Sequence, residues 1–126
     1  MMTIVTHTEV KDGAERRWDA VMRERMIAAK AQPGWIGGQL LRSADEPNKR
    51  VIVGTWRARA DWEKWHKDPR FAETRQELDE LVTGPAEHWW HEVVLDVRKA
   101  GVKAAPPAAK SKGKRSAKRK ARYTGR

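Results

Sequence analysis

Residues 54–85 read GTWRARADWEKWHKDPRFAETRQELDELVTGP, and this stretch decides how the chain is organised. A strand is expected to end at Trp56 and a helix to follow, in which Trp62, Trp65 and His66 share one face through their i, i+3, i+4 spacing. Such an aromatic stripe is most often core packing, and the alternative is a stacking wall for a flat aromatic ligand. If the protein has a pocket, this stretch is expected to form one wall of it.

Asp68 and Pro69 interrupt this helix and start another one. Asp68 is a suitable N-cap, and Pro69 would occupy the first helical position, where its missing N–H costs nothing. Apolar residues then recur at helical spacing until Gly84 and Pro85 provide a stop signal. The break predicts two short helices that bend over a sheet, with room for a pocket beneath them.

Arg75 lies on the apolar face of the second helix, four residues after Phe71 and three before Leu78. A guanidinium in that position must extend to solvent, pair with a carboxylate, for which Glu9 and Asp61 are candidates, or face a cavity. In a cavity, the cation could stabilise a developing oxyanion or phenolate. What lies beside Arg75 therefore distinguishes a structural ion pair from a site.

The remaining pattern predicts four strands and one longer helix. Strands are expected at residues 3–11, 35–42, 50–56 and 88–97, and a helix at residues 13–31. Asp12 would cap that helix, with Glu15 completing a capping box. The second and third strands are close in sequence and predict an antiparallel hairpin. Gly37 and Gly38 predict a bulge or a close backbone approach within it.

The order of these elements, β-α-β-β-α-β, predicts the α+β class and a ferredoxin-like plait, with a four-stranded antiparallel sheet and both helices on one face. The strands nevertheless carry large apolar side chains on both faces, as Ile4 beside Val5 and Trp89 beside Trp90 show. A second apolar face of that size is unfavourable in a monomer. We therefore expect it to be buried against another subunit in a two-fold homodimer.

Charge divides the chain into two parts, residues 1–97 and residues 98–126. The second part holds 12 of the 27 Lys and Arg residues and no Asp or Glu, so the first part has 15 basic and 17 acidic residues and a net charge of −2. With almost no large apolar residue, the second part is expected to be a disordered basic tail. Its charge favours contact with a polyanion, nucleic acid first and acidic membrane surfaces second, and the alternative is a solubilising tail with no partner.

Other classes of site are disfavoured by composition. The chain has no Cys, which excludes disulfides, thiolate metal sites and cysteine nucleophiles. His88 and His91 would point to opposite faces of a strand, and no HxxxH or HExxH spacing occurs, so no metal site is expected. No apolar run reaches the roughly 18–20 residues that cross a bilayer, and no signal-peptide pattern is present, so a cytoplasmic protein is expected.

Two segments carry a resemblance to a known family. The segments QPGWIGGQLL and VIVGTWRARADWEKWHKDPRF, with a strand before them and another after Gly84 and Pro85, resemble the antibiotic biosynthesis monooxygenases, a family of dimeric α/β barrels. The resemblance covers roughly residues 2–97. It implies a dimeric barrel and one of several activities, since the family includes cofactor-independent oxygenases of polycyclic phenols and quinols as well as heme-degrading oxygenases.

The resemblance to the heme-degrading branch is partial. That branch uses an Asn on the first strand, a Trp on the second helical segment and an axial His. Trp65 matches the Trp, but Thr6 stands near the Asn position and Arg75 at the His position. The comparison therefore disfavours heme, and no cofactor is expected.

The quinol-oxidising branch is more similar in kind, with Trp and Arg side chains lining a pocket that holds a phenolate for direct reaction with O2. By analogy, Trp65 would stack on an aromatic substrate, Arg75 would stabilise its anion, and His7 or His66 would assist proton transfer. Three hypotheses follow: a cofactor-independent monooxygenase of a quinol-like compound, a heme-binding or heme-degrading monooxygenase, and a non-catalytic dimeric binding module tethered to nucleic acid by residues 98–126.

Overall fold

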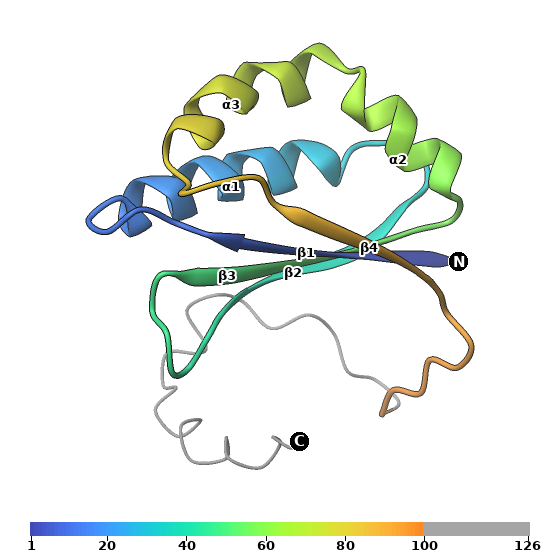
Figure 1. Ribbon diagram of the computed structural model, residues 1–126. Helices are drawn as coiled ribbons and strands as arrows, with labels where there is room; N and C mark the ends of the chain where they lie inside the picture. The colour runs from blue at the N-terminus through green and yellow to red at the C-terminus, as the bar shows by residue number, and fades with distance from the viewer. Residues whose placement is uncertain (100–126) are drawn as a thin grey trace. The chain divides into compact units, whose positions relative to one another are not determined.

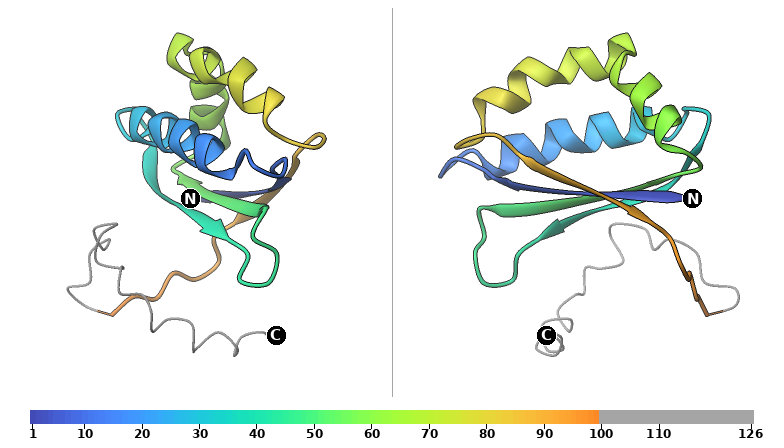
Figure 2. Two further views of the ribbon diagram at one scale, coloured as in Figure 1. Left: turned by 90° about the vertical axis from the view of Figure 1, so that its left-hand side faces the viewer. Right: turned by 45° about the vertical axis from the view of Figure 1, so that its right-hand side comes forward.

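The computed structural model describes residues 1–99, in which four strands and three helices follow the predicted order (Figure 1). The elements are β1 (Met2–Glu9), α1 (Glu15–Ala29), β2 (Trp35–Arg42), β3 (Lys49–Trp56), α2 (Arg59–His66), α3 (Pro69–Glu80) and β4 (Glu87–Glu92). The strands form one antiparallel sheet in the order β2-β3-β1-β4. All three helices cover the same face of that sheet (Figure 2), which confirms the predicted α+β plait.

The β2–β3 hairpin contains both irregularities that the glycine pair predicts. The register shifts between Trp35 and Gly37, so the strand bulges there. A Cβ atom on Gly38 would lie 2.6 Å from Cη2 of Trp35 and 2.9 Å from the carbonyl oxygen of Val53. Gly38 is therefore needed because the Trp35 ring lies directly over its backbone.

The start of α1 differs from the prediction. The N-cap is Ala14, without a side-chain hydrogen bond, and Asp12 lies two residues too early to cap the helix. Gly13 separates them in a left-handed conformation, with a φ of 86°. The expected capping box does not form, and the Glu15 carboxylate instead accepts a hydrogen bond from the backbone N–H of Gly13 at 2.9 Å.

The start of α3 confirms the prediction, whereas its end comes earlier. Oδ1 of Asp68 accepts a hydrogen bond from the backbone N–H of Arg70 at 2.8 Å, and Pro69 is the first helical residue. The helix ends at Glu80, ahead of the glycine–proline stop. The chain after it pairs with the end of β1, where the N–H of Thr83 donates to the carbonyl of Glu9 at 3.0 Å. These backbone bonds draw the chain out of the helix.

The last strand is shorter than the predicted residues 88–97. β4 pairs only with β1, and its final residue, Glu92, lies opposite Met2, the first residue of β1. Beyond that point the pairing is reduced to one bond, from the N–H of Val93 to the carbonyl of Met1 at 3.1 Å. β4 therefore ends opposite the first residue of β1.

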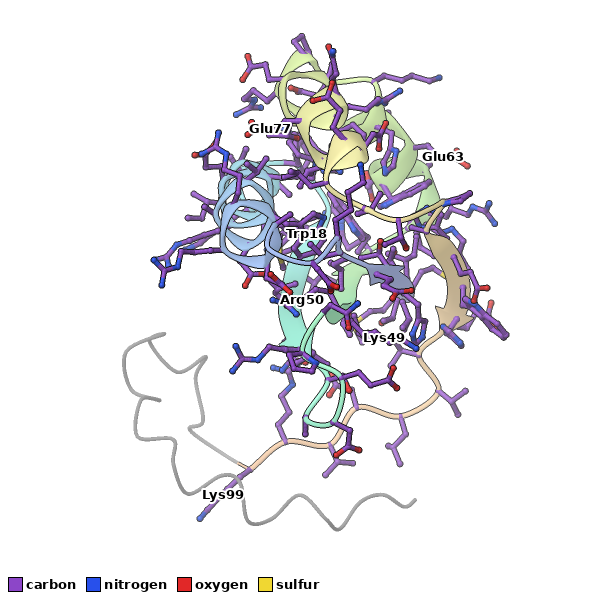
Figure 3. All side chains as sticks on the ribbon, turned by 60° about the vertical axis from the view of Figure 1, so that its left-hand side comes forward. Trp18, Lys49, Arg50, Glu63, Glu77 and Lys99 are labelled. Atoms are coloured by element: carbon purple, nitrogen blue, oxygen red, sulfur yellow. The ribbon has the colours of Figure 1, made fainter. Side chains whose placement is uncertain are left out.

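The buried side chains between helices and sheet fall into two clusters. The first surrounds Trp18, which points from α1 toward the sheet (Figure 3) and is 2% exposed. Its other buried members are Val10, Val21, Met22 and Leu78. The second consists of Ala29, Trp56, Trp65 and Phe71. Two clusters in place of one continuous core leave space between them.

The compact unit comprises Met1–Val94, and a second unit begins at Leu95, of which residues 95–99 are described. Nearly all of the predicted basic tail, residues 98–126, lies outside the described residues, so its disorder and its domain boundary stay predictions. Within residues 1–99, no helix is long and apolar enough to span a membrane.

Candidate active site

A cavity of about 400 Å³ lies between the helices and the sheet. Its lining includes Trp18, Met22 and Leu78 from the first buried cluster and Trp56, Trp65 and Phe71 from the second. Most of this surface is apolar and aromatic, and a few polar groups reach it. A cavity of this size and character is typical of a small-molecule site.

His66 lies in an aromatic stack on the helical wall of the cavity. Its ring centroid is 3.7 Å from that of Trp62, the residue one turn earlier on α2, and 3.9 Å from that of Phe71 on α3. Burial, and after it the positive charge of Arg25, lowers the pKa of His66 to about 4, with smaller contributions from His88 and Arg75 in the same direction. The imidazole is therefore neutral at pH 7, and its unprotonated nitrogen can accept a hydrogen bond.

Trp65 fits both alternatives for the aromatic stripe, core packing and the wall of a cavity. Only 3% of it is exposed, and its ring meets the edge of Phe71 at 5.7 Å, so it is a core residue. It also lines the cavity. Around it, Trp35 meets Trp56 edge-on at 5.3 Å. Flat indole surfaces therefore bound the cavity from α2 and from the sheet.

Arg75 lines the cavity and has no ion pair with any residue in the described part of the chain. Neither Glu9 nor Asp61, the two carboxylates considered from sequence, is its partner. Its Nη2 donates to the backbone carbonyl of His66 at 3.5 Å, and its Cζ lies 5.1 Å from the centre of the Phe71 ring. The side chain is exposed, so Arg75 stands at the rim of the cavity with its charge uncompensated.

Arg25 is a cavity residue that the sequence reading missed. It lies on α1, where Nε donates to Oγ1 of Thr74 at 2.7 Å and Nη2 donates to the carbonyl of Phe71 at 3.2 Å. Burial, with the nearby charge of Arg75, lowers its pKa to about 10, and Asp79 opposes that shift. A signal for it existed, because Arg25 interrupts the apolar stripe of α1 at the same spacing that singled out Arg75 on α3.

The histidines from the strands divide between the two sheet faces. Thr6 and Thr8 line the cavity, so His7, between them on β1, points to the opposite, helix-free face and is absent from the lining. His88 on β4 lines the cavity instead, with Nδ1 3.0 Å from Oγ1 of Thr6. Burial lowers its pKa below the ordinary value. Of the four residues expected from sequence, the cavity therefore brings together Trp65, His66 and Arg75, with His88 in place of His7.

In the described part of the chain, neither a metal-binding cluster nor the axial His of the heme-degrading branch is found where it was considered. Within residues 1–99, no group of three or more His, Asp or Glu side chains is arranged to hold a metal ion. The resemblance to heme-degrading enzymes would require an axial imidazole where Arg75 stands, and a guanidinium does not ligate iron. The polar lining suits an organic anion better than a metal-bound group.

Comparison with protein families gives one match. The sequence profile of the family "Antibiotic biosynthesis monooxygenase" matches residues 1–77. No curated protein matches the chain.

Solved structures with the same fold cover most of this chain. SnoaB, a cofactor-independent oxygenase from Streptomyces nogalater, is 23% identical, with a TM-score of 0.69 over 78% of this chain and 97% of its own. Rv0793 from Mycobacterium tuberculosis is 18% identical, with a TM-score of 0.70 over 77% of this chain and 98% of its own. PA3566 from Pseudomonas aeruginosa is 13% identical, with a TM-score of 0.68 over 75% and 94%. At these identities the likeness concerns the fold alone.

Proposed function

Because the chain belongs to the antibiotic biosynthesis monooxygenase family, we propose that it is a small monooxygenase that oxidises an aromatic, quinol-like compound with O2 and without a cofactor. The observation that carries the proposal is Arg75, a cation without a carboxylate partner in the described chain, at the rim of a cavity walled by Trp65 and other aromatic rings. SnoaB, which has this fold, is a cofactor-independent oxygenase, and this supports the absence of a cofactor here.

The chemistry needs no external reductant. Loss of the phenol proton gives a phenolate, which is electron-rich enough to pass an electron to O2. A carbon–oxygen bond then forms on the ring, and loss of water leaves a quinone, so one oxygen atom enters the product and the other leaves as water. In this scheme Arg75 stabilises the phenolate, and Trp65 holds the ring flat. His66, neutral at pH 7, accepts a hydrogen bond from the phenol and assists transfer of its proton to solvent; with a pKa of about 4 it does not keep the proton.

Oxygen consumption with a naphthohydroquinone or anthrone substrate tests the proposal. Removing one positively charged group that stabilises the anion is expected to lower kcat about 100-fold in Arg75→Ala. Trp65 is tested by Trp65→Phe, which keeps an aromatic side chain in the core. Arg23→Ala is the matched control, because Arg23 is exposed on α1 and outside the cavity lining. A rate in Arg75→Ala equal to that of the control would refute the site.

The helix-free face of the sheet supports assembly as a homodimer. Trp89 is 58% exposed and Leu41 is 43% exposed, and Val5 lies directly opposite Trp89 on the neighbouring strand. Such a surface is unfavourable in water and is well suited to pack against its own copy. Sedimentation of Trp89→Asp is expected to give a monomer where the wild type gives a dimer. A wild-type chain that sediments as a monomer would refute the assembly.

The heme and tail hypotheses have separate tests. A Soret shift on hemin titration would favour the heme-binding alternative. The tethering role of residues 98–126 predicts salt-sensitive binding to DNA or RNA that is lost when these residues are deleted, while oxygen consumption is kept.

We further propose a cytoplasmic location.

A further inference from the structure

The cavity concentrates positive charge at one end. Arg25 and Arg75 both lie against the Phe71 ring, with their Cζ atoms 3.7 Å and 5.1 Å from its centre. The two Cζ atoms are therefore no farther apart than the sum of these distances, so both positive charges lie close to the same ring. Both residues reach the cavity from different helices, α1 and α3.

Neither guanidinium has its charge matched by the protein. Within residues 1–99, no carboxylate forms an ion pair with Arg25 or Arg75. Arg25 donates from Nε to Thr74 and from Nη2 to the carbonyl of Phe71. Its Nη1 makes no hydrogen bond to the described residues. Asp79 also lines the cavity, but it does not come within ion-pair distance.

Arg25 is half-buried, and holding its charge close to that of Arg75 is unfavourable unless something compensates it. Burial, and after it the charge of Arg75, lowers the pKa of Arg25. Replacing either arginine by an apolar residue would remove that cost, so a role in folding alone gives a weak account of the pair. An anionic ligand would remove the cost as well.

We propose that the ligand of this cavity is an aromatic compound that carries a carboxylate, which binds between Arg25 and Arg75 beside Phe71 while the aromatic ring lies among the indole surfaces. This proposal rests on the proposed function and narrows its substrate class to aromatic acids. Arg25 is then a specificity residue: it selects an acid over a neutral compound of the same shape. Asp79 acts as a competitor, because its carboxylate faces the same positive charge.

Binding of a matched pair of probes tests this. The probes are 2-naphthoate and 2-naphthamide, which share the ring and the carbonyl and differ in charge, and quenching of tryptophan fluorescence reports binding to the full chain. Charge-assisted hydrogen bonds from a guanidinium predict that wild type binds the acid at least about tenfold more tightly than the amide. Arg25→Gln is expected to abolish this preference and keep the affinity for the amide, whereas Asp79→Asn is expected to increase the affinity for the acid.

Arg23→Gln is the control, since it removes one positive charge from the same helix outside the cavity. It also accounts for nonspecific attraction of the acid to the many Lys and Arg residues after residue 97. Equal affinities for acid and amide in wild type, or a preference that survives Arg25→Gln, would overturn the proposal and leave the aromatic cavity standing. Failure of both probes to bind would overturn it together with the proposed aromatic substrate, whatever the variants show.

Discussion

Protonation of His66 is expected to destabilise the fold as the pH falls below neutrality. Its imidazole lies between the rings of Trp62 and Phe71, and burial followed by the charge of Arg25 lowers its pKa from 6.5 to about 4. Between these two values the unfolded chain binds the proton and the folded chain does not. The free energy of unfolding must therefore decrease as the pH falls from about 6.5, and level off below about 4.

The size of the effect follows from the two pKa values. A difference from 6.5 to about 4 corresponds to about 3 kcal/mol if the ring is completely shielded. The side chain of His66 is only partly buried, and solvent screens the repulsion from Arg25, His88 and Arg75, so about 1–2 kcal/mol is the expected loss. For a domain of this size, the loss corresponds to a decrease in Tm of roughly 5–15 °C.

Urea denaturation at pH 7.5, 6, 5 and 4 measures this loss in the wild type and in His66→Gln. Carboxylates that become protonated affect both proteins, so the contribution of His66 is the difference between the two profiles. Parallel profiles for wild type and His66→Gln would refute the reasoning, and an NMR titration of the His66 ring would then show an ordinary pKa.

Two further predictions concern single contacts in the fold. Gly38→Ala places a Cβ atom 2.6 Å from the Trp35 ring and is expected to lower the free energy of unfolding by about 1–3 kcal/mol. In Gly37→Ala the new Cβ atom meets nothing within 4 Å, so this variant is expected to be nearly neutral. Equal Tm values for the two variants would contradict the packing of Trp35. Asp68→Ala removes the cap of α3 and is expected to lower the free energy of unfolding by about 1 kcal/mol, measured by urea denaturation. Asp12→Ala is expected to change it by less than about 0.5 kcal/mol, because Ala14 is the cap of α1. A larger loss from Asp12→Ala would contradict the cap at Ala14.

Local signals in the sequence predicted most of the fold. Asp68 and Pro69 mark the start of α3 because capping involves atoms only two residues apart. Trp62 and His66 come into contact because one helical turn brings them together. The bulge in β2 follows from the glycine pair at positions 37 and 38. In each case the partners are neighbours in the chain, so their types and spacing suffice.

The ends of elements were predicted less well because their limits are set from a distance. β4 ends at Glu92, opposite the first residue of β1, although Val94 and Leu95 continue the strand-like pattern. α3 ends at Glu80 because the following chain bonds to Glu9. Periodicity along the chain contains no information on how long the partner strand is.

The sequence by itself determined the order of the elements and the aromatic wall of α2, because these depend on contacts within a few residues, and the order β-α-β-β-α-β in turn predicts the plait. Only the tertiary structure decided which polar groups share the cavity. It brings Arg25 from α1 against Phe71 on α3 and His88 from β4 beside Thr6 on β1, and it directs His7 away. These pairs are 46 and 82 residues apart in the chain, so their contact depends on how the helices and strands pack and on the register of the sheet.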